Sequence, residues 1–120
     1  MAAGAVHTLP KKERLSGRTD ISRLLDKGRY GIASCLKYCY LTGTGLPYGR
    51  ILVSVPKRHF KRAVKRNLLK RRVREAFRLN AARLGERRYD IFIYYVGKEV
   101  ADYERIDKSL AQILDDLAAR

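Results

Sequence analysis

The sequence has few acidic residues, only two cysteines and no long hydrophobic run. Its 120 residues contain 12 Asp and Glu against 27 Lys and Arg, which gives a formal net charge of +15. The longest apolar run, 91–96, is far shorter than the roughly 20 residues that span a bilayer. We therefore expect no membrane partner. The charge excess and a pI near 10.3 favour a polyanionic partner over an acidic protein surface.

The two cysteines, Cys35 and Cys39, predict neither a disulfide nor a metal site. In an extended strand they would lie about 13 Å apart, too far for a disulfide. His7 and His59 are distant in sequence and complete no zinc pattern. We expect buried thiols in a reducing compartment, and therefore a cytoplasmic protein. Because no metal pattern is present, we also expect that the protein holds no cofactor of its own.

The length fits one domain, and an apolar share of 46% supplies a modest core. The first ten residues lack the basic start and the apolar stretch of a signal peptide. We predict a flexible tail over residues 1–9 and a single domain over residues 10–118.

Hydrophobic spacing and turn residues predict three helices and four strands. Thr19 or Asp20 can cap the first helix, and Gly28 and Gly85 end the first and second. The predicted helices are 20–27, 63–84 and 107–117, and the strands are 30–32, 36–41, 50–55 and 89–96. The order αβββαβα predicts an α+β class, a two-layer α-β sandwich with a mixed four-stranded sheet.

The second predicted helix and the loop before it carry most of the excess positive charge. Residues 57–78 hold eleven Lys or Arg and one acid, Glu75, for a net charge of +10. Solvated helices normally alternate charges of opposite sign three or four residues apart, whereas Lys70, Arg71 and Arg74 repel one another. A phosphate backbone beside this face would turn the repulsion into attraction.

Residues 66–75 resemble the signature helix of the bacterial ribonuclease P protein family, which reads R-N-x-x-K-R-x-x-R-E. All six fixed positions match, at Arg66, Asn67, Lys70, Arg71, Arg74 and Glu75. The strand that ends in Pro56-Lys57-Arg58, the pair Arg14-Leu15 and the strand after Arg88-Tyr89-Asp90 resemble the segments around that helix. The resemblance covers about residues 9–117.

The resemblance implies a subunit of an endoribonuclease that removes the 5′ leader from precursor tRNA. In that family the RNA subunit catalyses the cleavage with Mg²⁺, so we expect no catalytic residue in this protein. The implied partners are the catalytic RNA and precursor tRNA, with no DNA. The implied fold contains a left-handed β-α-β crossover, against the usual right-handed rule.

By this resemblance the basic helix and the loop before it bind the catalytic RNA. A helical wheel places Arg66 nearer the buried stripe than the other basic residues. The residues predicted to bind RNA are Lys57, Arg58, Lys61, Arg62, Lys65, Arg66, Asn67, Lys70, Arg71, Arg74 and Arg78.

The resemblance also implies a cleft between the first helix and the sheet that binds the single-stranded leader. We predict that Ile21 and Leu25 line this cleft, and that Tyr38 and Tyr40 stack on bases of the leader. Packing of these two tyrosines in the core remains an equal alternative.

Two positions depart from the family pattern. Many members have a third Arg after the Arg-Asn pair, where this chain has Leu68, so Lys65 or Arg72 would have to replace that phosphate contact. Many members also have Phe on the cleft side of the first helix, where this chain has Ile21 and Leu25.

Other classes of protein fit the sequence less well. A ribosomal-type RNA-binding protein needs a basic face but not Asn67 in this spacing. A basic-zipper protein needs a leucine heptad repeat, and Gly85 ends the helix too soon. A protein-only nuclease needs clustered carboxylates to hold Mg²⁺, and the acids are scattered.

Overall fold

The computed structural model describes residues 14–15, 17–46, 48–85 and 88–119. Within these ranges the elements follow the order that the hydrophobic spacing predicts. Their bounds are α2 Arg18–Lys27, β1 Arg29–Ala33, β2 Leu36–Leu41, β3 Arg50–Ser54, α3 Ala63–Asn80, the 3₁₀ turn η2 Ala81–Leu84, β4 Asp90–Tyr95 and α4 Tyr103–Ala118. The predicted flexible tail, 1–9, lies outside the described residues.

The four strands form one mixed sheet in the order β1-β2-β4-β3. The pairs β1–β2 and β2–β4 are antiparallel, whereas β3 and β4 are parallel. Strand β4, the last in sequence, therefore lies between β2 and β3. The α+β class and the mixed four-stranded sheet agree with the prediction.

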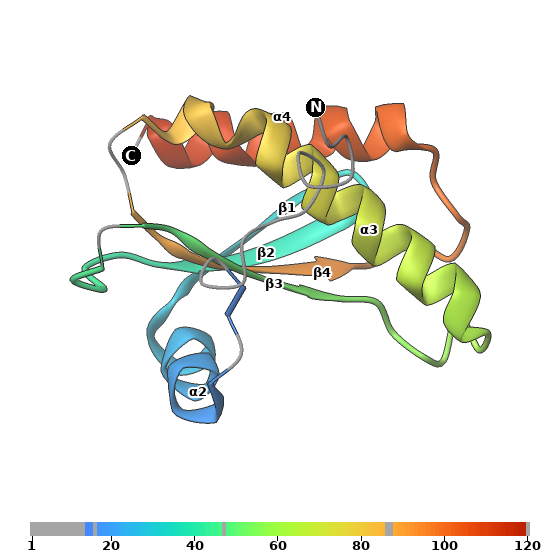
Figure 1. Ribbon diagram of the computed structural model, residues 1–120, viewed down its shortest axis with the longest axis horizontal. Coiled ribbons are helices and arrows are strands. Elements are labelled where there is room, and N and C mark those ends of the chain that lie inside the picture. The colour runs from blue at the N-terminus through green and yellow to red at the C-terminus, as the bar shows by residue number, and fades with distance from the viewer. Residues whose placement is uncertain (1–13, 16, 47, 86–87, 120) are drawn as a thin grey trace, which may run out of the picture.

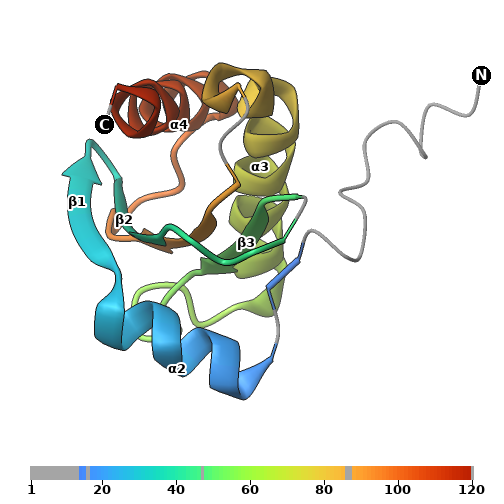
Figure 2. The ribbon, with the colours of Figure 1, turned by 90° about the vertical axis from the view of Figure 1, so that its left-hand side faces the viewer.

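Helix α3 joins the parallel strands β3 and β4 by a left-handed crossover. In Figure 1 both strands run from left to right and α3 returns from right to left above them. Figure 2 shows that β3 lies in front of β4 in the first view. The path therefore turns anticlockwise as it recedes from the viewer, which is the handedness that the family resemblance implies.

Helices α3 and α4 cover one face of the sheet, and α2 lies on the other (Figures 1 and 2). The main core lies between the sheet and the α3–α4 layer, because the inward stripes of both helices and the inward faces of β2, β3 and β4 are apolar. A smaller cluster forms under α2 from Leu15, Leu24 and Cys39. Since both faces are covered, strands β2 and β4 carry apolar side chains on both sides.

The helix ends differ from the predicted ones for local reasons. Helix α2 begins after Gly17 without a side-chain cap, so Thr19 and Asp20 lie in its first turn and the predicted cap is wrong. Helix α3 ends at Asn80, whose amide donates to the Ala76 carbonyl at 2.8 Å, and the chain continues as η2. Helix α4 begins about one turn earlier than predicted, because the Asp102 carboxylate accepts from the Arg105 backbone N–H.

Candidate RNA interface

The loop between β3 and α3 presents basic side chains on a fixed support. Phe60 is buried, and its ring packs edge-on against Tyr95 with 5.6 Å between centroids. The Arg66 guanidinium donates to the carbonyls of Phe60 and Lys61 at 2.7 and 2.9 Å. These contacts hold the loop while four predicted RNA-binding residues remain exposed: Lys57, Arg58, Lys61 and Arg62.

Arg66 differs from the other predicted RNA-binding residues because one of its guanidinium nitrogens is used within the protein. It lies toward the buried side of α3, as the helical wheel predicts, and shapes the loop. We therefore assign it a positioning role, which the signature alone could not distinguish from RNA contact.

Helix α3 buries one side and turns a basic side outward. Its buried stripe consists of Leu69, Val73, Ala76 and Phe77, and Leu84, which follows them in the chain, is buried in η2. On the outward side lie Asn67, Lys70, Arg71 and Arg74, which we call the crest of α3. Asn67 and Arg71 are exposed, and Lys70 and Arg74 are half-buried.

Arg74 lies near Arg14, which the sequence analysis did not include in the site. Partial burial and the charge of Arg14 lower the pKa of the Arg74 guanidinium. Residues 14 and 15 run beside β3, since Leu15 N–H donates to the Ile51 carbonyl at 2.8 Å. No ion pair to either arginine forms among the described residues, so a phosphate between them would relieve their repulsion.

Two further arginines of α3 are engaged within the protein. Arg78 pairs with Glu75 at 2.6 Å, which raises the pKa of its guanidinium. Arg72 donates to the Ala101 carbonyl at 2.5 Å. Of the two residues that could replace the phosphate contact missing at Leu68, the exposed Lys65 is therefore the better placed.

A basic hollow of about 400 Å³ lies beside the first turn of α3. Lys61, Arg62 and Lys65 line one side, and Lys98 and Glu99 come from the loop between β4 and α4. Lys98 is not among the residues predicted to bind RNA, because it is 33 residues from Lys65 and outside the signature. Its position depends on the parallel pairing of β3 and β4, which brings the end of β4 beside the end of β3.

The face of the sheet that carries α2 offers a second surface, which we call the α2-side face. Strand register places Lys37, Tyr94 and Ser54 in one row across β2, β4 and β3. The next row contains Phe92, which packs under α2 together with Ile21. Phe92 and Tyr94 are half-buried with 6.2 Å between ring centroids, and Lys37 is exposed. Aromatic rings beside a lysine suit a single-stranded nucleic acid.

The predicted leader cleft is wrong in two of its four residues. Tyr38 and Tyr40 are 4% and 5% exposed and belong to the main core, on the opposite face from α2. The β-strand alternation correctly put them on one side, but that side faces α3 and α4. Ile21 does pack against the α2-side face, and Leu25 lies on α2 with 40% of its surface exposed.

A half-buried arginine, Arg50, ties α2 to the sheet. The Arg50 guanidinium makes two hydrogen bonds to the Asp90 carboxylate, at 2.9 and 2.7 Å, and a third to Asp20 of α2 at 3.0 Å. Asp90 is 1% exposed. These bonds raise the pKa of Arg50, so it stays charged and fixes the first turn of α2 against the sheet.

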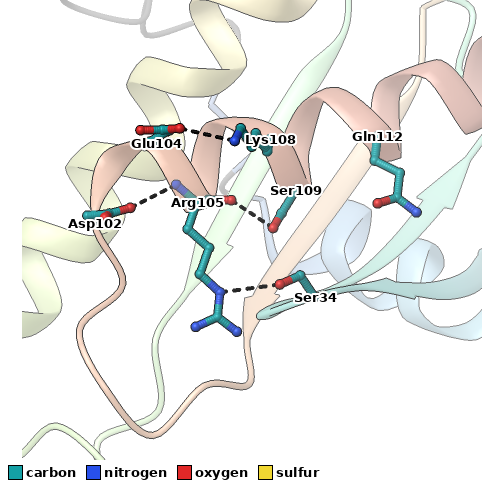
Figure 3. Close-up of a pocket in the computed structure, with 7 residues that line it drawn as sticks. All are labelled: Ser34, Asp102, Glu104, Arg105, Lys108, Ser109 and Gln112. Atoms are coloured by element: carbon teal, nitrogen blue, oxygen red, sulfur yellow. Dashed lines mark hydrogen bonds and ion pairs between the residues drawn. The ribbon is translucent and has the colours of Figure 1, made fainter.

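A polar hollow at the start of α4 is internally paired (Figure 3). Glu104 pairs with Lys108 at 3.0 Å, and Arg105 donates to Ser34 at 3.4 Å. The hollow is lined by acids and bases alike, so its charge favours no nucleic acid, and we assign it no role in the interface.

Neither a metal cluster nor a membrane helix occurs among the described residues. No group of three or more His, Cys, Asp or Glu in these ranges could hold a metal ion. No helix in the same ranges combines the length and apolar character needed to cross a bilayer.

Comparisons with known proteins agree with this geometry. The family model of Ribonuclease P matches residues 9–118. The ribonuclease P protein component of Porphyromonas gingivalis is 34% identical over 98% of this chain and 92% of its own length. That of Borrelia hermsii is 36% identical over 86% of this chain and 92% of its own.

Solved structures of ribonuclease P proteins superpose on this chain. The ribonuclease P protein of Thermotoga maritima superposes with a TM-score of 0.74 at 27% identity, over 87% of this chain and 96% of that one. The Staphylococcus aureus protein superposes with a TM-score of 0.74 at 23% identity, over 87% and 94%, and supports the fold alone.

Proposed function

The chain belongs to the ribonuclease P protein family, the protein subunit of an endoribonuclease, and we propose how its two surfaces divide the work. The crest of α3 and the basic loop dock on the catalytic RNA, with which this family acts. The α2-side face holds the single-stranded 5′ leader of precursor tRNA. Catalysis, with Mg²⁺, belongs to the RNA.

The arrangement of charge is the observation that carries this proposal. Residues 57–78 place a net charge of +10 on one loop and one helix side, and the crest forms no ion pair among the described residues. Such a surface gains most from a dense line of phosphates, whose condensed counterions are released on binding. Cys35 and Cys39 are buried free thiols, which supports the expectation that the protein acts in the reducing cytoplasm.

Reconstitution tests the division of labour. The catalytic RNA and precursor tRNA are combined at limiting Mg²⁺ with and without the protein, and the protein is also assayed alone. We expect the protein to lower the Mg²⁺ concentration needed for cleavage and to cleave nothing alone. Cleavage of precursor tRNA by RNA-free protein would overturn the assignment of catalysis to the RNA.

Salt dependence tests the docking surface. Arg71→Gln and Arg74→Gln should each weaken binding of the catalytic RNA and reduce the slope of log affinity against log salt by about 1. Arg29→Gln is the control, because Arg29 is an exposed arginine on β1, the edge strand farthest from β3. An unchanged slope in both crest variants would exclude direct phosphate contact.

The leader proposal rests on Tyr94 and Lys37 in place of the buried tyrosines. Tyr94→Ala removes a stacking surface, and stacking is worth about 1–3 kcal/mol per base. We expect at least fivefold weaker binding of precursor tRNA to the holoenzyme, with mature tRNA unaffected. Tyr38→Phe, in the core, should leave both unchanged. Equal losses for the two tRNAs in Tyr94→Ala would indicate a role in folding.

A further inference from the structure

An apolar groove of about 440 Å³ lies between α3 and the start of α4, beside the crest. It is lined by Arg71, Arg72, Glu75, Leu79 and Tyr103. Its volume lies within the range of about 300–1,000 Å³ that is usual for sites of small organic groups. None of Leu79, Tyr103 and Glu75 is among the residues predicted to bind RNA.

Two side chains of the groove are unusual for a protein surface. Leu79 is 57% exposed although it is a large apolar residue in the last turn of the basic helix α3. The Tyr103 hydroxyl is buried and has no hydrogen-bond partner among the described residues. Buried polar groups are normally hydrogen-bonded, and an exception calls for an explanation such as a ligand that supplies the partner.

The rim of the groove carries the charge that a nucleotide requires. Arg71 stands on the crest, is exposed and pairs with no described residue. Arg72 holds the Ala101 carbonyl, so its aliphatic stem forms part of the wall. A flat base could lie against Leu79 and the Tyr103 ring, while the phosphate of the same nucleotide meets Arg71.

We propose that the groove receives one unpaired nucleobase of the catalytic RNA, and that the Tyr103 hydroxyl hydrogen-bonds to it. This inference rests on the proposed docking of the crest on that RNA. Continuity with the crest is the reason to assign RNA as the occupant, because a strand whose phosphates lie on Arg71 brings its bases within reach of the groove. An apolar segment of a protein would gain nothing from the charge of Arg71 at the rim.

The test compares binding of the ribonuclease P RNA of the same organism to wild-type protein and three variants over a range of salt. Leu79→Ser removes the apolar wall and should weaken binding about fivefold or more. Tyr103→Phe removes only the hydroxyl and should weaken binding about threefold. Both should leave the salt slope unchanged, since no phosphate contact is lost. Ile32→Ser, 66% exposed on β1, is the matched control and should bind as wild type.

Two further measurements separate binding from stability. Urea midpoints should be unchanged in Leu79→Ser and unchanged or higher in Tyr103→Phe, because the latter removes a buried unpartnered hydroxyl. Dimethyl sulfate probing should show a base that wild-type protein protects and Leu79→Ser does not, whereas Ile32→Ser protects it.

The outcomes distinguish this inference from the proposed function. If Arg71→Gln flattens the salt slope while Leu79→Ser and Tyr103→Phe bind and protect as wild type, the groove proposal fails and the docking proposal stands. If the wild-type protein does not bind the RNA, both fail. Equal losses of binding and stability in the groove variants would also reject a nucleobase site.

Discussion

At the scale of single residues, the ion pair between Arg50 and Asp90 is the interaction most sensitive to substitution. Arg50→Leu would leave the carboxylate of Asp90, which is 1% exposed, without its partner. Breaking a buried pair from one side costs about 3–5 kcal/mol. We expect a loss of that size in the free energy of unfolding, measured with urea at pH 7.

A double-mutant cycle gives the control for this prediction. Arg50→Leu combined with Asp90→Leu removes both charges and should be clearly less destabilised than the sum of the two single variants. Arg29→Leu, exposed on β1 at the opposite edge of the sheet, should change stability little. Additive losses in the cycle would mean that the two side chains act separately.

Residue identity predicted the outward side of α3 but not every contact on it. The helical period separates Lys70, Arg71 and Arg74 from the buried Leu69 and Val73, so the crest follows from the sequence. The bonds from Arg66 to the loop carbonyls and the approach of Lys98 depend on how distant segments pack. No local pattern encodes those positions.

At the scale of elements, β2 shows why the leader cleft was mispredicted. Its alternation puts Leu36, Tyr38 and Tyr40 on one face and Cys39 and Leu41 on the other. Both faces are apolar because helices cover the sheet on both sides, so alternation cannot say which face receives α2. The placement of α2 is set by its own contacts with Cys39 and Arg50.

Helix α2 offers a prediction of its own, because Asp20 holds it to Arg50. Asp20→Ala should cost only about 1 kcal/mol of stability, since the pair is partly exposed. It should loosen α2 and reduce the preference of the holoenzyme for precursor over mature tRNA at least twofold. The measurement is the ratio of the two dissociation constants.

Arg23→Gln provides the comparison for Asp20, because Arg23 bonds to the same carboxylate from the solvent side at 3.1 Å. Its removal leaves the bond from Asp20 to Arg50 in place and should not change the ratio. If Asp20→Ala weakened both tRNAs equally, α2 would not control the leader surface.

At the scale of the whole molecule, the net charge of +15 opposes folding while it favours binding. Raising NaCl from 0.02 to 0.5 M should therefore stabilise the free protein by about 1 kcal/mol, because salt screens the repulsion within the basic segment. The same change should weaken its complex with the catalytic RNA by orders of magnitude.

The two measurements, a urea midpoint and a dissociation constant, should move in opposite directions with salt. A midpoint that fell with NaCl would mean that the charges of the free protein are already compensated within the fold. The slope of log affinity against log salt for the complex also reports the number of phosphates that the whole surface contacts. Each crest variant should therefore reduce this slope.

The central position of β4 has a consequence for how the chain folds on the ribosome. Strands β2 and β3 have no bond to each other, and both pair with β4, which is synthesised last among the strands. Until Tyr95 has emerged, the β1–β2 hairpin and β3 cannot join, and α3 has no complete sheet on which to pack. The nascent polypeptide therefore carries its most cationic segment without the complete sheet beneath it until β4 has been synthesised.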